Sequence, residues 1–397
     1  MPRLAATFAT TPGSGLQEMA MAARGVTGAI HLEIGDPNFT TPDHIIDAAA
    51  AAAHAGFTHY PPSAGIETLR EALAAKVRDR NHFPCSPEQV VVTTGAAGGL
   101  FTTLLVLLDP GDEVLIPNPG WPTYPAMVHV LNAVPVSYPM RRQQGFVPDI
   151  AEVEALITRR TKILIISSPA NPTGVVYSRD TISAFTDLAT RHDLWLISDE
   201  CYDEIILEGE HVSVAAVDDS ERVISVFTFS KTYAMTGWRI GYVVGRSLIA
   251  NAVTKAQRPV LSATSIISQK GAEAALLGSQ APVREMVEAY RSRRDLTMRL
   301  LDEASVPYVR PKGAFYIMVD VAPATNSTAF AKALLTERLV SVTPASAFGS
   351  EGEGMVRVSL AVGPEALAEG IPRLVQAIRD TPPVPGKAQQ TVASGPR

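Results

Sequence analysis

The stretch "RVISVFTFSKTYAMTGWRIGY", residues 222–242, places a lysine soon after an apolar run of strand length. A run that is apolar on both faces is typical of a strand buried inside a parallel sheet. Lys231 follows two hydroxyl residues, Thr228 and Ser230, and a turn then leads to Arg239. Hydroxyl groups and a planar guanidinium suit a phosphate group. A lysine at a strand end is by itself more often a solvated surface residue, so the neighbours of Lys231 carry the functional interpretation.

Four other apolar runs repeat this arrangement of a strand followed by polar residues. They cover residues 89–95, 112–118, 161–169 and 194–200, and helical stretches separate them. This alternation predicts an α/β fold with a mainly parallel sheet covered on both faces. The five polar segments are "TTGAAGG" (93–99), "NPGWPTY" (118–124), "SSPANPTG" (167–174), "SDECY" (198–202) and "FSKTY" (229–233). Because ligands in such folds bind beyond the carboxyl ends of the strands, these segments indicate one common site.

The pattern changes after about residue 281, where a long charged helix is predicted, followed by short apolar runs. This change predicts a second, smaller α+β domain. We assign residues 46–282 to a large cofactor-binding domain, and residues 1–45 plus 283–380 to the small domain with its N-terminal arm. Residues 381–397 are rich in proline and polar residues, which is typical of a disordered tail.

Composition excludes several classes of protein. The chain of 397 residues is 46% hydrophobic and carries a formal net charge of −6, so we expect neither a nucleic-acid partner nor an anionic membrane partner. We expect no membrane-spanning segment, because no window reaches about 18 apolar residues. The two cysteines, Cys85 and Cys201, form no metal-binding or disulfide pattern, so we expect no metal and a cytoplasmic location.

Single residues at the strand ends each allow a structural and a functional interpretation. Asp199 is either an N-cap of the next helix or, if a heteroaromatic cofactor binds at this edge of the sheet, a carboxylate that keeps a ring nitrogen protonated. Asn171 is either a turn residue before proline or, like Tyr202, a donor to a ring oxygen. Trp121 is either a core residue or a stacking surface. The "GAAGG" segment is either a tight connection or a phosphate site at a helix N-terminus.

Taken in order, these motifs resemble the fold type I pyridoxal-phosphate (PLP) enzymes, and among them the class I aminotransferases of the prokaryotic aspartate aminotransferase-like subgroup. The resemblance extends from "EIGDPNFTTPDHI" (33–45) through "THYPPSAGIETLREAL" (58–73) to "GMVRVSLAV" (354–362). It implies a fold type I PLP-dependent transferase, with a mainly parallel sheet in a large domain and a smaller α+β domain.

The resemblance also implies a role for each matching residue in holding pyridoxal 5'-phosphate. Lys231 would carry the cofactor as an imine, Asp199 would pair with the ring nitrogen, and Trp121 would stack on the ring. Tyr202 and Asn171 would bond the phenolic oxygen, so that Lys231, Asp199 and Tyr202 are the expected catalytic residues. The phosphate would be held by the amides of Ala96 and Ala97, by Thr228, Ser230 and Arg239, and by Tyr60 of a second subunit. That last contact implies a homodimer with shared active sites.

The implied reaction is ping-pong transamination between an amino acid and a 2-oxo acid. Arg357 would take the substrate α-carboxylate, with the Gly35 backbone closing over it and with Trp121 and Asn171 completing the substrate site. The amino acid would pass its amino group to the cofactor through the Lys231 imine, and a second 2-oxo acid would accept it.

One departure from the subgroup bears on specificity. In aspartate-preferring members a lysine of the glycine-rich turn meets the distal carboxylate of the substrate, whereas this chain has Ala97 there. We therefore expect a neutral or hydrophobic amino donor. Two further departures, Cys201 and Asn38, are not expected to touch the chemistry.

Three alternatives stay open at this level. The first is a PLP-dependent lyase or oxidase acting on an amino acid, because the same cofactor apparatus supports those reactions. The second is an aspartate aminotransferase. The third is a non-enzymatic regulator that senses PLP, but residues 1–45 show no basic DNA-binding pattern that such a protein needs.

Overall fold

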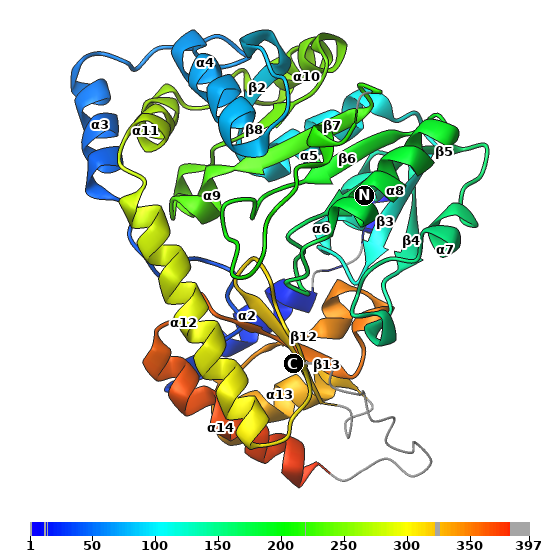
Figure 1. Ribbon diagram of the computed structural model, residues 1–397, viewed down its shortest axis with the longest axis vertical. Coiled ribbons are helices and arrows are strands. Elements are labelled where there is room, and N and C mark those ends of the chain that lie inside the picture. The colour runs from blue at the N-terminus through cyan, green and yellow to red at the C-terminus, as the bar shows by residue number, and fades with distance from the viewer. Residues whose placement is uncertain (1, 12, 14, 219, 322–325, 382–397) are drawn as a thin grey trace.

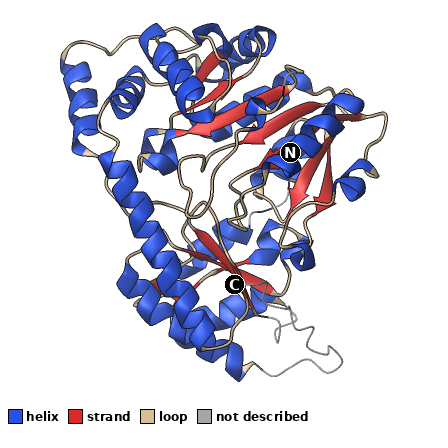
Figure 2. Cartoon of the chain, in the orientation of Figure 1, coloured by secondary structure: helices blue, strands red, loops and turns tan. Residues whose placement is uncertain are grey.

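The computed structural model describes residues 2–11, 13, 15–218, 220–321 and 326–381 of the chain. Most of its elements gather around two sheets that lie at opposite ends of an elongated molecule, and the long helix α12 runs from below α11 to the end that holds the smaller sheet (Figure 1). Helices surround both sheets (Figure 2).

The larger sheet has seven strands in the order β2-β8-β7-β6-β5-β3-β4. Only β8 runs antiparallel to its neighbours, β2 and β7. The strands are β2 (Val90–Thr93), β3 (Glu113–Asn118), β4 (Val134–Pro139), β5 (Thr161–Ser167), β6 (Trp195–Asp199), β7 (Val223–Thr228) and β8 (Gly241–Val244). Its central strands β5, β6 and β7 are buried along nearly their whole length, as their apolar sequences predict.

Two groups of helices cover the faces of this sheet, because alternate strand residues point to opposite sides. Ile163 and Ile165 of β5 pack in one core with α5 (Gly95–Leu107), α6 (Thr123–Val130) and α10 (Ser247–Leu261). Leu164 and Ile166 pack in the other with α7 (Ile150–Glu154) and α8 (Arg179–Arg191). Helices α3 (Asp43–His54), α4 (Glu67–Lys76) and α11 (Ile266–Leu277) lie toward the β2 edge of the sheet, and the short α9 (Phe229–Thr232) lies at the carboxyl end of β7 (Figure 1).

The smaller sheet is antiparallel, in the order β12-β13-β10-β9. Its strands are β9 (Tyr308–Val309), β10 (Tyr316–Asp320), β12 (Thr343–Pro344) and β13 (Met355–Ser359). A parallel pair, β1 (Ile30–His31) and β11 (Val340–Ser341), joins the N-terminal segment to this end of the molecule. The helices here are α2 (Gly15–Arg24), α12 (Ala281–Glu303), α13 (Ser327–Arg338) and α14 (Pro364–Asp380), whereas α1 (Ala6–Ala9) lies beside α6.

Short helical turns complete the chain. The π-helix η1 (Val77–Asn81) continues α4, and the 3₁₀ turns are η2 (Pro87–Gln89), η3 (Arg142–Gln144), η4 (Val214–Ala216), η5 (Thr236–Trp238), η6 (Ala345–Phe348) and η7 (Ser350–Gly352).

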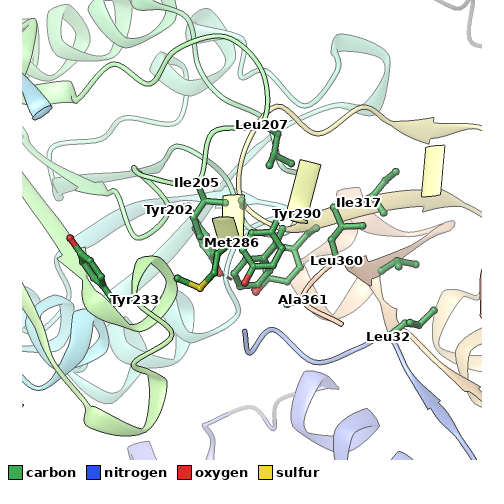
Figure 3. Close-up of a cluster of buried hydrophobic side chains, with 14 of the residues drawn as sticks. Leu32, Tyr202, Ile205, Leu207, Tyr233, Met286, Tyr290, Ile317, Leu360 and Ala361 are labelled. Carbon is green, nitrogen blue, oxygen red and sulfur yellow. Dashed lines mark hydrogen bonds between the residues drawn. The ribbon is translucent and has the colours of Figure 1, made fainter. Parts of the chain in front are cut away.

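A buried cluster connects the two ends of the molecule. Figure 3 shows Tyr202, from the loop after β6, beside Met286 and Tyr290 of α12. Ile317 of β10 and Leu360, which follows β13, extend the same cluster into the smaller sheet. The loop that follows β6 is therefore fixed by packing against both sheets.

The predicted α/β class with a mainly parallel sheet is confirmed, although neither β4 nor the antiparallel β8 was predicted as a strand. The division into domains stays a prediction, and its boundary at residue 282 falls in the first turn of α12. Of the predicted disordered tail, only Thr381 lies within the described residues. Among those residues, no helix is both long enough and apolar enough to cross a membrane.

Candidate active site

Lys231 lies on the short helix α9, which begins where β7 ends. The helix is capped by Thr228, whose hydroxyl oxygen accepts a hydrogen bond from the Ser230 N–H at 3.2 Å. The Lys231 ammonium donates to the carbonyl oxygen of Gly35 at 2.7 Å. Gly35 belongs to the N-terminal segment, so two distant parts of the chain meet at the amine.

Three kinds of anion-binding group converge beside α9. The Thr228 hydroxyl donates to the Ser230 hydroxyl at 3.0 Å, and Thr228 pairs with Gly241 across β7 and β8. A Cβ on Gly241 would lie 2.8 Å from the amide nitrogen of Ala96, so the hydroxyls adjoin the N-terminus of α5. The guanidinium of Arg239 reaches the same helix start, at Gly95. Helix amides, hydroxyls and a guanidinium together form a site that fits a phosphate group.

The glycine at position 95 leaves room for this guanidinium. Gly95 has a φ of 68°, a left-handed conformation that glycine adopts without strain. A Cβ there would lie 2.7 Å from Nη2 of Arg239, so a larger residue would displace the guanidinium from this position. Nη1 of Arg239 donates to the Thr236 carbonyl at 2.7 Å, which fixes the orientation of the side chain.

Asp199 ends strand β6 and is buried, with 6% of its surface exposed. Its Oδ2 accepts a hydrogen bond from the Tyr124 hydroxyl at 2.5 Å, and its Oδ1 accepts one from the Cys201 N–H at 3.2 Å. Burial raises the pKa of Asp199, and the hydrogen bonds from Cys201 and Tyr124 oppose that rise. A cation placed against this carboxylate would stabilise its ionised form.

Trp121 precedes α6 and meets Tyr124 edge to face, with ring centroids 5.4 Å apart and planes at 86°. Trp121 is only half-buried, so part of its flat indole surface does not pack in the core and can contact a ligand ring.

Arg357, on β13, is the largest fully buried side chain, with 1% of its surface exposed. Nη1 donates to Oδ1 of Asn171 at 3.0 Å, and Nη2 donates to the Glu33 carbonyl at 2.6 Å. Its guanidinium carbon lies 4.1 Å from the ring centroid of Tyr316 and 4.8 Å from that of Phe348.

No carboxylate of the described residues forms an ion pair with Arg357, and its Nε has no hydrogen-bond partner among them. Burial lowers the pKa of Arg357, since the charged form loses its hydration. A buried cation without an anion is costly. The arrangement therefore fits a ligand that brings its own carboxylate.

Two phenols link the Lys231 and Arg357 regions. The hydroxyls of Tyr202 and Tyr316 lie 3.0 Å apart, and burial raises the pKa of Tyr202 well above its usual range. The backbone of Gly35 passes close to this pair, because a Cβ on Gly35 would lie 2.3 Å from the Tyr316 hydroxyl. Only glycine lets the N-terminal segment approach so closely.

The structure thus brings most of the predicted residues to one place, with two exceptions of different kinds. Ala97 lies in the first turn of α5 and is half-buried, but it makes no polar side-chain contact. Tyr60 is 90% exposed and has no hydrogen bond to any other described residue.

Sequence reasoning missed three residues of this site: Tyr124, Tyr316 and Cys201. Tyr124 stands in the quoted segment "NPGWPTY", three residues after Trp121, where helical spacing brings the two side chains together. Cys201 was expected to lie outside the chemistry, yet its backbone N–H donates to Asp199. A turn directly after a buried carboxylate commonly supplies such a donor.

Comparison with known proteins agrees with this geometry. The family model described as "Aminotransferase class I and II" matches residues 27–378. The chain belongs to this family. The aminotransferase is 40% identical over 354 residues to the "Probable aspartate/prephenate aminotransferase" of Thermus aquaticus, covering 88% of this chain and 91% of the relative. It is 35% identical over 373 residues to "Aromatic-amino-acid aminotransferase 2" of Thermococcus litoralis, covering 92% and 96%.

A solved structure shares the whole architecture of the aminotransferase. The aspartate aminotransferase of Thermus thermophilus with maleate superimposes with a TM-score of 0.91, at 38% identity, covering 95% of this chain and 100% of the other. The resemblance to fold type I PLP enzymes is therefore confirmed, and with it the fold class, the pyridoxal-phosphate cofactor and transamination as the activity. The phosphate-suited groups around Gly95 and the buried carboxylate of Asp199 are residues that fit this cofactor.

Proposed function

We propose that this aminotransferase transfers the amino group of a neutral or hydrophobic amino acid to a 2-oxo acid, with Lys231 as the group that moves the proton. The observation that carries the proposal is the buried Arg357, which has no ion-pair partner among the described residues. Its guanidinium donates a hydrogen bond to the side chain of Asn171. An amino acid and a 2-oxo acid share the α-carboxylate that such a guanidinium binds bidentately. Both halves of a ping-pong reaction can therefore use one carboxylate site.

The other proposed roles follow the positions of the side chains. Lys231 would hold the pyridoxal through its amine, and the same amine, when free, would take up the proton that leaves the substrate Cα. When bound, the cofactor supplies an electron sink for the charge that develops at that carbon. Asp199 would keep the ring nitrogen protonated, and Trp121 would stack on the ring. Tyr202 and Asn171 would donate to the phenolic oxygen.

The phosphate is proposed to be bound by groups already close together in the single chain. They are the amides of Ala96 and Ala97, the hydroxyls of Thr228 and Ser230, and the guanidinium of Arg239. Gly35 is proposed to close over the substrate, since its carbonyl oxygen already accepts a hydrogen bond from Lys231 and its backbone lies against the Tyr316 hydroxyl.

Absorbance of the bound cofactor during a half-reaction tests the proposed chemistry. The holoenzyme is mixed with one amino acid at a time, without a 2-oxo acid, across a panel of donors. Conversion of the cofactor to its pyridoxamine form, with one equivalent of 2-oxo acid released, is the expected result. Release of ammonia with the original absorbance restored would instead identify a lyase.

Donor preference is expected to depend on Ala97. A methyl group leaves the distal carboxylate of aspartate without a cation, and each missing charge-assisted hydrogen bond costs about 1.5–3 kcal/mol. Wild type should therefore favour leucine, phenylalanine, methionine or alanine over aspartate in kcat/KM. Ala97→Lys should raise kcat/KM for aspartate by about one to two orders of magnitude.

Arg357→Lys is the matched comparison, because it acts on the carboxylate that every donor shares. It should raise KM for all donors alike, since an ammonium cannot reproduce the bidentate fork. A wild type that prefers aspartate to all four neutral donors would contradict the proposed specificity, as would an Ala97→Lys variant with unchanged selectivity. The names of relatives include both aspartate and aromatic aminotransferases, so family membership alone does not fix the donor.

We further propose that the aminotransferase is a homodimer in which Tyr60 reaches the phosphate of the other subunit. Tyr60 is an aromatic side chain left almost wholly exposed, and Val260 and Leu261 at the end of α10 are also exposed. The side chain of Gln257, one turn earlier, donates to the carbonyl of Ser63, so the two segments adjoin. Neighbouring exposed apolar residues are typical of an interface.

Sedimentation equilibrium should show a dimer, and Tyr60→Phe should keep it while weakening PLP binding about tenfold, the value of one hydrogen bond to a charged group. A monomer with full PLP affinity would refute the shared site.

We also propose a cytoplasmic location. The two cysteines, Cys85 and Cys201, are free thiols, which suit a reducing compartment.

A further inference from the structure

We propose that Tyr124 is a positioning residue for the reaction, which holds Asp199 ionised and oriented so that Asp199 can keep the cofactor ring nitrogen protonated. The inference rests on the proposed role of Asp199 and adds a residue that the motifs did not indicate. It depends on a contact between two segments 75 residues apart in the sequence.

The geometry assigns each oxygen of the carboxylate its own donor. Oδ2 accepts from the Tyr124 hydroxyl at 2.5 Å, and Oδ1 accepts from the Cys201 N–H at 3.2 Å. One donor on each oxygen restricts rotation of the carboxylate about its χ2 torsion. Each oxygen keeps a further lone pair for a proton-bearing ring nitrogen.

In its contact with Asp199 the phenol donates and the carboxylate accepts. Tyr124 is 1% exposed, and burial together with the neighbouring Asp199 charge raises the pKa of its hydroxyl well above the usual range. The phenol therefore keeps its proton, and the negative charge stays on Asp199. A donor to the charged form of a buried carboxylate offsets part of the cost of burying it.

Tyr124 also ties Asp199 to the residue proposed to stack on the ring. Tyr124 lies in the first turn of α6 and Trp121 two residues before the helix, and their rings meet edge to face with centroids 5.4 Å apart. One rigid helix start thus sets both the proposed stacking surface and the orientation of the carboxylate. Loss of the Tyr124 hydroxyl should raise the pKa of Asp199 and weaken its hold on the ring proton, without removing the stacking surface.

The test compares Tyr124→Phe with wild type, using PLP labelled with ¹⁵N at the ring nitrogen. In the variant holoenzyme the ¹⁵N chemical shift should move toward that of the unprotonated ring, and kcat/KM should fall about ten- to a hundredfold. With the cofactor analogue that carries a carbon in place of the ring nitrogen, the half-reaction rates of the variant and wild type should agree within about twofold, because that ring has no proton for Asp199 to hold.

Tyr138→Phe is the matched control. Tyr138 is fully buried, and its hydroxyl donates to the Ile165 carbonyl at 2.9 Å, away from Asp199. The Tyr138→Phe variant loses one buried hydrogen bond, as Tyr124→Phe does, but it should leave the ¹⁵N shift unchanged. If Tyr124→Phe does not fold, 3-fluorotyrosine incorporated at position 124 gives the same readout, because a more acidic phenol donates more strongly and should move the shift toward the protonated value.

Asp199→Asn separates failure of this inference from failure of the proposed function. If Asp199→Asn moves the ¹⁵N shift and the changes at Tyr124 do not, the role of Tyr124 is refuted while that of Asp199 stands. If Asp199→Asn leaves the shift unchanged, the proposed role of Asp199 is wrong and this inference falls with it. An equal loss of rate in Tyr124→Phe with PLP and with the analogue would also refute it, since the defect would then be structural.

Discussion

Alanine in place of Lys231 should leave a folded protein that binds PLP noncovalently but lacks the imine absorbance, with turnover reduced by about four orders of magnitude or more. The loss is large because one amine is proposed to do two jobs, attaching the cofactor and moving the proton at the substrate Cα. The measurements are the absorbance spectrum of the reconstituted variant and its single-turnover rate with a good donor.

Lys270→Ala provides the control for this experiment. Lys270 is a partly buried lysine on α11 that pairs with Glu273 at 2.7 Å, so its loss changes charge and packing without touching the site. It should keep both the absorbance and the rate. Turnover of Lys231→Ala within tenfold of wild type would show that another base moves the proton.

Removing the charge of Asp199 should have the second largest effect. Asp199→Asn and Asp199→Ala should each slow proton abstraction by about three orders of magnitude, because a neutral residue cannot keep the ring nitrogen protonated. The readout is the single-turnover rate of the half-reaction, with the thermal unfolding temperature measured beside it.

The asparagine variant distinguishes this role from a structural one. Its amide oxygen can still accept from the Cys201 N–H, so the turn after β6 is preserved. If Asp199 only caps that turn, asparagine should behave like wild type and alanine should not. Equal and large losses in both variants are expected if the charge is what matters.

Much of the architecture was predictable because hydrophobic periodicity is a local signal. The runs at 161–169, 194–200 and 222–231 contain β5, β6 and β7, and the stretch predicted as a long helix from 282 is α12. The signal failed at β4, an edge strand with exposed and half-buried positions, and at β8, a strand of only four residues. Neither has a long uninterrupted apolar run, because prolines and Ser137 interrupt β4 and Gly241 begins the short β8.

The residues of the candidate site were predictable for a different reason. Asp199 ends a buried strand, Lys231 and Asn171 follow closely after two others, and parallel strands bring their carboxyl ends to one edge. The sequence showed that Gly95 lies in a turn, but it did not show why a glycine is needed at that position. The guanidinium that a Cβ would strike belongs to Arg239, far along the chain.

The sequence by itself determined the class of fold, the positions of the buried parallel strands β2, β3, β5, β6 and β7, and the identity of the polar residues at their ends. Each of these depends on patterns within a few residues. The tertiary structure decided which of these groups meet. Lys231 contacts Gly35 across 196 residues, Arg357 contacts Glu33 across 324, and Tyr124 contacts Asp199 across 75. It also decided their charge environment, since burial and partners alone set the pKa directions of Asp199 and Arg357. These contacts and these pKa directions depend on how segments distant in the sequence pack together, and local hydrophobic periodicity does not encode that packing.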